Sequence, residues 1–243
     1  MTPGLGEIFF IYFAKIFFSF IGEILVMLSF SPFESLAQQL LPLAIESDDG
    51  AHDIAHLYRV WKNAQKICEA ESGNLRLVFT AVLLHDCVSV EKNSPNRHLA
   101  SRMAAEKAAL ILKELQWNED DITAVCHAIE AHSFSAALTP RTLEAQIVQD
   151  ADRLDSIGLI GISRCFYTSG RMGSSLYDFH DPLAKQREYD EKAYAVDHFY
   201  TKLFKIESGF QTASGKQMAH ERAGRMKQFL NSFLDEIQAG PVN

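Results

Sequence analysis

Aspartate and histidine residues gather in four short segments of the chain, and side chains of these two types can together bind a metal ion. The first segment is residues 52–56 (HDIAH) and the second is residues 85–86 (HD). The third contains His127 and His132, and the fourth is residues 150–155 (DADRLD). Imidazole nitrogens and carboxylate oxygens are good ligands for Mn, Fe, Co, Ni and Zn. The four segments therefore indicate a divalent metal site if the fold brings them together.

The pair His85-Asp86 stands at the end of a strongly apolar stretch, AVLLHDCV. A helix there would deliver both side chains to a low-dielectric pocket, where unpaired charges are costly unless a cation compensates them. A metal held by few protein ligands keeps open positions for water and for substrate oxygens. These residue types therefore favour metal-assisted hydrolysis.

Helical geometry restricts which members of each segment can act together. His52 and His56 are four residues apart, so both can face the same side of a helix. The two histidines alone are weak evidence, because a histidine on a helix is more often packed or solvated than a ligand. Asp150 and Asp152 point about 200° apart on a helix, so only one of them should face a metal.

The elements that must position these residues are predicted to be helices, because apolar residues recur at spacings of three and four. Alternation of apolar and polar residues, which is typical of strands, is scarce. The sequence predicts an all-α fold, a single-domain helical bundle over residues 31–243, with residues 170–182 as its longest loop. The helices are expected over about 54–68, 75–83, 103–115, 122–129, 143–162, 183–206 and 214–237.

The composition is that of a folded globular protein and excludes several classes. The chain has 243 residues, of which 47% are hydrophobic and 22% charged, and its net charge is −8. An acidic protein lacks the positive field that broad binding to nucleic acid requires. The four cysteines show no CxxC or other close spacing in the sequence, which is typical of reduced cytosolic thiols rather than of a disulfide or zinc framework. The sequence therefore predicts a cytoplasmic protein and no nucleic-acid partner.

Residues 1–30 form an apolar N-terminal extension with three interpretations. The run from Ile8 to Phe30 is about long enough to span a bilayer, but Lys15 and Glu23 interrupt it. It is a membrane anchor, a packing or dimerisation helix, or the product of an upstream start, with Met27 as the true first residue. We favour the third interpretation, and we expect membrane association only if residues 8–30 are an anchor.

The order H…HD…D resembles the HD-domain metal-dependent phosphohydrolases, and the longer runs are similar to their YedJ-like bacterial branch. The resemblance covers about residues 51–206, and the runs around HSFSA and IVQDADRLD are its most specific parts. The matching stretches are HDIAHLYRVWKNA, LLHDCVSVEKNSPNR, AIEAHSFSA, EAQIVQDADRLDSIGLIGISR and YAVDHFYTKLFKI.

The resemblance implies a helical HD-type fold with one divalent metal ion at its centre. By motif position, His56 matches the first ligand, His85 and Asp86 the doublet, and Asp152 the final aspartate. Asp150 is the rival of Asp152. His52 would then lie behind the ligands or pack, and Asp53 would cap its helix. Mn²⁺ is the expected ion, with Co²⁺, Ni²⁺, Fe²⁺ and Mg²⁺ as alternatives.

Further polar side chains are predicted to bind a phosphorylated substrate. A lysine and a forked arginine in the loop after the doublet would neutralise phosphate oxygens. His127 and His132 would contact phosphate, or alternatively bind a second ion. Asp86, Lys92 and His132 are the predicted catalytic residues. The predicted substrate-binding residues are Arg59, Lys92, Asn93, Arg97, His127, His132 and Arg153.

The predicted activity is hydrolysis of a phosphate ester or anhydride by water that the metal activates, with Asp86 as a ligand that also accepts the proton. The best substrate hypothesis is a (deoxy)nucleoside triphosphate cleaved to monophosphate and pyrophosphate. One alternative is a nucleotide-binding or signalling module without turnover. Another is a phosphodiesterase of cyclic or dinucleotide signals, which is disfavoured because such relatives often carry a GYP-type sequence where this chain reads CVSVEKN. The sequence does not predict the oligomeric state.

Overall fold

The computed structural model describes residues 30–44, 54–88, 90, 94, 96–133 and 136–238, and helices dominate these residues. The one extended pairing among them is a bridge between Ser175 and Tyr194. The predicted all-α fold is confirmed. In chain order the elements are α2 (Glu34–Ala44), α3 (Ile54–Glu71), α4 (Leu75–Leu84), the 3-10 turn η1 (Arg97–Leu99), α5 (Ala100–Glu114), α6 (Glu119–His132), α7 (Leu143–Asp155), α8 (Gly158–Met172), the π-helical turn η3 (Phe199–Leu203), α9 (Phe204–Ile206), the 3-10 turn η4 (Glu207–Gly209) and α10 (Ala213–Glu236).

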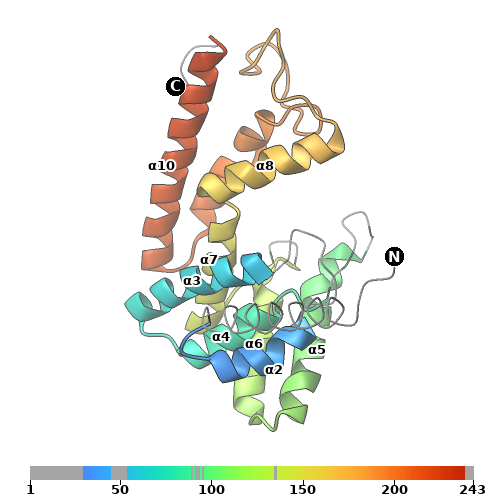
Figure 1. The fold of residues 1–243 in the computed structure, drawn as a ribbon, viewed down its shortest axis with the longest axis vertical. Coiled ribbons are helices and arrows are strands. Elements are labelled where there is room, and N and C mark those ends of the chain that lie inside the picture. Colours follow the sequence, from blue (N-terminus) through green and yellow to red (C-terminus); the bar gives the residue numbers. More distant parts are fainter. Residues whose placement is uncertain are drawn as a thin grey trace, which may run out of the picture.

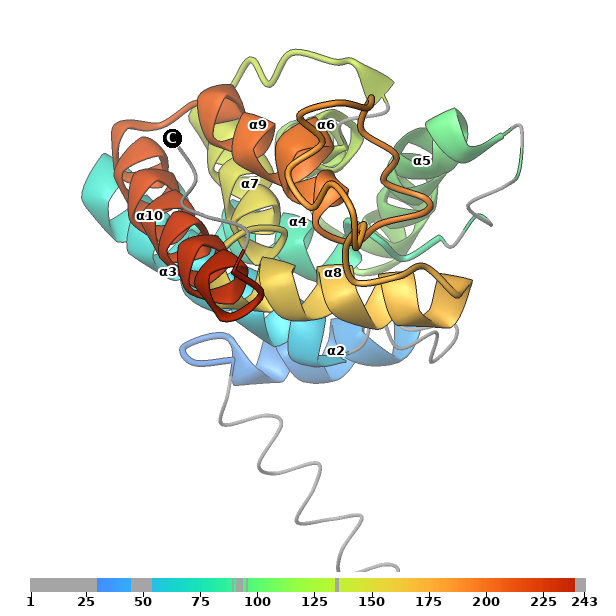
Figure 2. The ribbon, with the colours of Figure 1, turned by 90° about the horizontal axis from the view of Figure 1, so that it is seen from above.

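Helix α4 is the centre of the bundle. Its sequence, LRLVFTAVLL, is apolar on all sides, and every residue from Leu77 to Leu84 is buried. A helix that is hydrophobic all round must be surrounded by other elements, and α4 packs against α2, α3, α6 and α7. Figure 1 shows these helices in the lower part of the molecule, with α8 and much of α10 above them. The view from above in Figure 2 shows α4 amid its neighbours.

Polar side chains set where four of these helices begin. Asn74 accepts hydrogen bonds from the first backbone N–H groups of α4, and Asn118 does the same at α6. Thr142 and Thr212 cap α7 and α10 in the same way. Such caps satisfy N–H groups that have no partner within the helix. They fix the position along the chain at which each helix starts, and hence which side chains each helix turns inward.

The prediction of a helix from Leu183 to Ile206 is wrong for the first half of that range. Residues 173–196 are irregular, and regular helical turns begin only at Asp197. Carboxylate side chains in this segment accept hydrogen bonds from its backbone. Asp181 accepts from the N–H groups of Lys185 and Gln186, and Asp197 accepts from that of Asp190. Local bonds of this kind compete with helix formation. The expected helix over 143–162 is also divided, because α7 ends at Asp155 and α8 starts at Gly158, whose φ is +74°.

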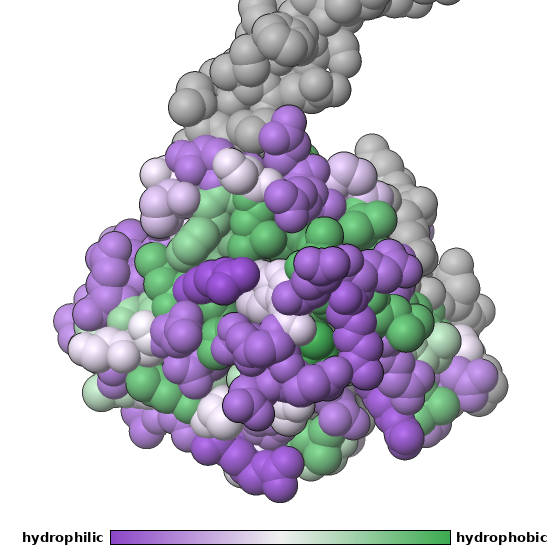
Figure 3. Space-filling model, turned by 90° about the horizontal axis from the view of Figure 1, so that it is seen from below, coloured by the Kyte–Doolittle hydropathy of each residue, from purple (hydrophilic) through white to green (hydrophobic). Residues whose placement is uncertain are grey.

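The outer surface is mixed in character. The face shown in Figure 3 is hydrophilic over most of its area, with apolar patches between the polar residues. None of the described helices is both long and apolar enough to cross a membrane. Residues 1–29 lie outside the described residues, so the three interpretations of the N-terminal extension, its boundary at residue 30 and the cytoplasmic location stay predictions.

The start of α10 is fixed to α7 through the buried carboxylate of Asp150. This carboxylate accepts hydrogen bonds from Gln211 N at 2.9 Å, from Thr212 N at 2.8 Å and from Thr212 Oγ1 at 2.7 Å. Burial raises the pKa of Asp150, and these hydrogen bonds oppose that rise. Gly215 lies directly against this hydrogen-bonded group, the Asp150 cluster, which is formed by Asp150, Gln211 and Thr212. A Cβ atom at Gly215 would clash with Asp150 Oδ2 and would lie 2.5 Å from Thr212 Oγ1.

We expect opposite effects from alanine at two glycines of α10. Gly215→Ala should lower the free energy of unfolding by about 1–3 kcal/mol, because the new methyl group overpacks the Asp150 cluster. Gly224→Ala is the matched control, because nothing lies within 4 Å of a Cβ there, and alanine should raise helix stability by up to about 1 kcal/mol. Urea unfolding of both variants measures the difference. Equal effects of the two changes would contradict the close approach at Gly215.

A pH-dependent link is predicted between the end of α3 and the start of α10. Glu71 Oε1 accepts hydrogen bonds from Ser214 N and Ser214 Oγ, both at 2.7 Å. The backbone and then the side-chain hydrogen bond from Ser214 lower the pKa of Glu71.

A carboxyl whose pKa is lower in the folded protein adds stability above its unfolded pKa, and this stability is lost as the pH falls through the folded pKa. Glu71→Gln should therefore cost about 0.5–1 kcal/mol at neutral pH, and the difference from the native protein should disappear well below pH ~4. Urea unfolding at both pH values checks this, and a cost independent of pH would contradict it.

Candidate metal centre

Four predicted side chains converge at one point of the bundle. His56 Nε2 lies 3.3 Å from His85 Nε2 and 3.6 Å from Asp152 Oδ1. His85 Nε2 lies 3.8 Å from Asp152 Oδ1 and 3.4 Å from Asp86 Oδ2. These atoms belong to the four residues that the sequence predicted as metal ligands. We call His56, His85, Asp86 and Asp152 the central cluster.

Three packed helices bring the cluster together. His56 lies in the first turn of α3, His85 and Asp86 follow the last residue of α4, and Asp152 lies in the second half of α7. Helix α3 packs against both α4 and α7. The two imidazoles are buried, whereas the Asp86 and Asp152 side chains are 29% and 25% exposed. The carboxylates therefore form the side of the cluster that a small molecule can reach.

The hydrogen bonds of the imidazoles decide which nitrogen of each neutral ring carries the hydrogen and which carries the lone pair. In His85 and His132, Nδ1 lies 2.7 and 2.6 Å from the backbone carbonyl oxygen of the residue three positions earlier. In His56, Nδ1 lies 2.8 Å from Asp155 Oδ2. Carbonyl and carboxylate oxygens accept, so each Nδ1 carries the hydrogen and donates it. In the neutral ring, Nε2 then carries the lone pair.

The central cluster therefore has the chemistry of a cation site. The Nε2 lone pairs of His56 and His85 face each other across 3.3 Å, which is repulsive unless a proton or a metal ion lies between them. Burial lowers the pKa of His85, but the charge and hydrogen bond of Asp86 and the charge of Asp152 outweigh it and raise that pKa to about 9. Burial also opposes ionisation of Asp86, yet His85 and His132 hold the pKa of Asp86 well below its usual range. Both shifts show that the cluster attracts positive charge, so these residues fit a divalent ion.

The structure separates Asp152 from its rival Asp150. Asp152 faces His56 and His85, whereas Asp150 is fully buried against Thr212 and the start of α10. The two aspartates therefore act on opposite sides of α7, as their two-residue spacing predicts.

The two predicted histidines of α6 have different positions. His132 is buried, and its Nε2 lies 3.7 Å from Asp86 Oδ1. Potential ligand atoms of His85, Asp86 and His132 all lie within 4.8 Å of one another, as do those of His56, His85 and Asp152. The structure does not bring His127 to either group, because His127 Nε2 accepts the backbone N–H of Arg141 at 2.9 Å.

Two predicted substrate-binding arginines bind protein oxygens in this structure. Arg59 donates from Nε to Asp155 Oδ1 at 2.7 Å and from Nη2 to Asp155 Oδ2 at 3.0 Å. Arg153 donates from Nη1 to the carbonyl oxygen of Gly209. A role of either residue in substrate binding stays a prediction. The same holds for Lys92, Asn93, His52, Asp53 and the side chain of Arg97, which lie outside the described part of the chain.

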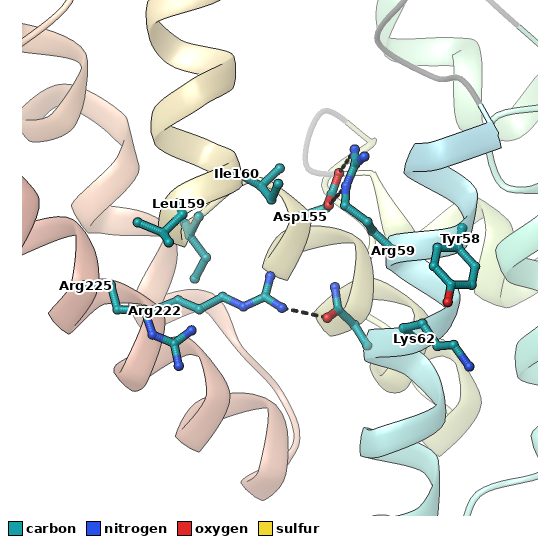
Figure 4. A pocket seen from close by; sticks show the side chains of 10 residues that line it. Tyr58, Arg59, Lys62, Asp155, Leu159, Ile160, Arg222 and Arg225 are labelled. Carbon is teal, nitrogen blue, oxygen red and sulfur yellow. Dashed lines mark hydrogen bonds and ion pairs between the residues drawn. The ribbon is translucent and has the colours of Figure 1, made fainter. Parts of the chain in front are cut away.

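Sequence reasoning missed Asp155, to which it gave no role of its own within the segment DADRLD. Asp155 is 1% exposed and holds His56, Arg59 and Arg164. Figure 4 shows Asp155 and Arg59 paired at the edge of a cavity of about 300 Å³, between the start of α8, α3 and α10. Asp155 is the last residue of DADRLD and lies one helical turn after Asp152. Its contact with His56 depends on the packing of α3 on α7, which the sequence segment alone does not indicate.

Comparison with known proteins gives a consistent result. The family model described as the HD domain matches residues 53–157. The uncharacterized protein YpgQ of Bacillus subtilis (strain 168) is 31% identical over 197 residues, which cover 79% of this chain and 88% of YpgQ. A crystal structure of an HD-superfamily hydrolase from Bacillus thuringiensis is similar with a TM-score of 0.66 and 31% identity, over 85% of this chain and 98% of that one. The structure of Bacillus subtilis YpgQ in complex with ADP is similar with a TM-score of 0.61 and 26% identity, over 88% and 96% of the two chains.

The stretch matched by the family model contains all four residues of the central cluster. The similarity between this protein and YpgQ extends over most of both chains. The resemblance drawn from the sequence is thereby confirmed: this chain belongs to the HD-domain family of metal-dependent phosphohydrolases.

Proposed function

We propose that the protein hydrolyses a (deoxy)nucleoside triphosphate to the monophosphate and pyrophosphate at a divalent ion held by His56, His85, Asp86 and Asp152. The observation that carries the proposal is the convergence of two imidazole Nε2 atoms and two carboxylates at one point of the bundle. A similar protein, YpgQ, has a structure in complex with ADP, which supports a nucleotide as the substrate class.

The ligand chemistry favours a first-row metal with mixed nitrogen and oxygen coordination. Two imidazoles and two carboxylates suit Mn²⁺, and Fe²⁺, Co²⁺ and Ni²⁺ share the same ligand preferences. A divalent ion supplies Lewis acidity, which lowers the pKa of water and polarises a phosphoryl oxygen. Because Asp86 and Asp152 are partly exposed, substrate phosphates can approach the cluster from their side.

The protein side chains orient the reactants and move the proton. Asp86 Oδ2 faces His85, and its Oδ1 faces His132 Nε2 at 3.7 Å. We assign to Asp86 the acceptance of a proton from the attacking water and to His132 its transfer onward or a hydrogen bond to a phosphate oxygen. Lys92, Asn93 and Arg97 follow the doublet in sequence and are proposed to neutralise the remaining phosphate charge.

Removing a ligand should abolish turnover and keep the fold. His85→Ala and Asp86→Ala should each reduce kcat/KM about 100-fold or more, because even the partners of metal ligands are typically worth ~10–100-fold. Far-ultraviolet circular dichroism should remain that of a helical protein. The control is His220→Ala, since the His220 side chain is 83% exposed and lies against Glu207, outside the central cluster. Full activity in either ligand variant would refute the site.

A panel of phosphate compounds tests the reaction itself. Nucleoside triphosphates, a nucleoside diphosphate, a simple monoester and a cyclic dinucleotide are each incubated with Mn²⁺, Co²⁺, Ni²⁺ or Mg²⁺ and with a chelator. We expect triphosphates with Mn²⁺ to give monophosphate and pyrophosphate in equal amounts, and the chelator to stop the reaction.

Other products would exclude the proposed reaction. Release of orthophosphate alone would contradict pyrophosphate formation, and cleavage of the cyclic dinucleotide alone would favour the phosphodiesterase alternative. Metal binding and nucleotide binding without turnover would favour the signalling module. Metal analysis that finds two ions per chain would assign His132 to a second ion instead of to phosphate.

A further inference from the structure

Asp155 is a buried, heavily hydrogen-bonded carboxylate beside the central cluster that the proposed function does not use. Its Oδ2 accepts from His56 Nδ1 at 2.8 Å, from Arg59 Nη2 at 3.0 Å and from Arg164 Nη1 at 3.2 Å. Its Oδ1 accepts from Arg59 Nε at 2.7 Å. The carboxylate is thus saturated by three side chains from α3 and α8, and solvent reaches only 1% of it.

The position of Asp155 excludes a role as a direct ligand to the same ion. It binds the Nδ1 edge of His56, whereas His85 and Asp152 lie at the Nε2 edge of the same ring. The two nitrogens point to opposite sides of an imidazole, so the ring stands between Asp155 and the centre of the cluster. Potential ligand atoms of His56, His85 and Asp152 lie within 4.8 Å of one another, and Asp155 is not a member of that group.

We propose that Asp155 is the positioning residue of the metal centre: it holds His56 in the tautomer and orientation that present Nε2 to the ion, and Arg59 and Arg164 hold Asp155 from the opposite side. The inference rests on the proposed metal site. It also gives Arg59 a function that is different from the predicted contact with substrate. Figure 4 shows how Arg59 reaches Asp155 along the edge of the cavity.

The energetic reason is the pairing of charges. Two arginines beside one buried carboxylate keep it ionised, because Arg59 donates to it at 2.7 and 3.0 Å and Arg164 at 3.2 Å. An ionised carboxylate can only accept, so it fixes the hydrogen of His56 on Nδ1. Carboxylate partners of metal-binding histidines commonly fix the tautomer and the orientation of the ring in this way.

An asparagine in place of Asp155 cannot reproduce this arrangement in either orientation of its amide. If the NH₂ group replaces Oδ2, it faces His56 Nδ1 as a donor. It then favours the tautomer with hydrogen on Nε2, and that nitrogen no longer has a lone pair for a metal. If the NH₂ group replaces Oδ1, it faces the Nε–H donor of Arg59. Each orientation therefore sets a donor against a donor in a buried place.

The matched control is Asp197, which is the same residue type in a similar setting away from the cluster. It is also 1% exposed, and it binds the two terminal nitrogens of Arg187 at 2.5 and 3.0 Å and the backbone N–H of Asp190 at 2.7 Å. Asp197→Asn breaks a buried arginine–aspartate pair without touching a histidine of the cluster. A loss of stability common to buried ion pairs should therefore appear in both variants.

The test measures Mn²⁺ affinity by electron paramagnetic resonance in the full chain and its two variants. We expect Asp155→Asn to weaken Mn²⁺ binding about 10–100-fold, in line with other partners of metal-binding histidines, and Asp197→Asn to leave it unchanged. In metal-free protein with ¹⁵N-labelled histidine, the nine histidines give separate signals, and His56→Gln assigns that of His56. Its ring should carry the hydrogen on Nδ1 in the native protein and shift toward Nε2 in Asp155→Asn.

The outcomes separate this inference from the proposed function. If the native protein binds no Mn²⁺, the proposed metal site fails. If the native protein binds Mn²⁺ and Asp155→Asn binds it equally well with an unchanged His56 tautomer, the positioning role of Asp155 is refuted. If both variants lose affinity to the same extent, the effect is one of general stability and the inference is also refuted.

Discussion

The metal centre depends on one constraint: the Nδ1–H group of each imidazole around it donates to an oxygen atom elsewhere in the protein. Backbone carbonyls take this hydrogen in His85 and His132, and the Asp155 carboxylate takes it in His56. The Nε2 lone pairs of the neutral rings are thereby directed toward one volume. Without these hydrogen bonds, neutral imidazoles would exchange tautomers, and the lone pairs would be available only part of the time.

This constraint determines what the rest of the bundle must do. The two carbonyl acceptors lie one turn before their histidines, so α4 and α6 supply them through ordinary helical geometry. The third acceptor lies on another helix, so the packing of α3 on α7 must be held in register. Asn63 on α3 donates to the backbone oxygen of Ala151 on α7 at 3.1 Å. Arg222 on α10 binds Asn63 Oδ1 at 2.7 Å and the backbone oxygen of Leu154. These hydrogen bonds fix the two helices that carry His56, Asp152 and Asp155.

The four residues of the central cluster could be selected from the sequence because their signals are local. The doublet His85-Asp86 ends an apolar helix, and motif position favours Asp152 over Asp150. The structure places Asp152 beside His56 and turns Asp150 toward the start of α10. Asp155 could not be predicted, because its role depends on the distance between α3 and α7. The irregular segment before Asp197 was also missed, since helical spacing of its apolar residues gives no warning that Asp181 and Asp197 bind backbone N–H groups. Local pattern thus identified most of the helices and the residues of the central cluster, whereas the features that it missed depend on hydrogen bonds that the spacing of apolar residues does not reveal.

The same lone-pair argument bears on the number of ions. The two groups of potential ligands share His85, but the Nδ1 of His85 is committed to a carbonyl oxygen, so a neutral His85 has one lone pair to offer. It cannot bind two ions at once. A second ion would then have Asp86 Oδ1 and His132 as its nearest described ligands, and His127 could not join them while its Nε2 accepts the N–H of Arg141. Two protein ligands are few for a resident ion, whereas the first group adds Asp86 to three converging side chains. The geometry of the described residues therefore favours one ion in the central cluster, with His132 left free to face a phosphate.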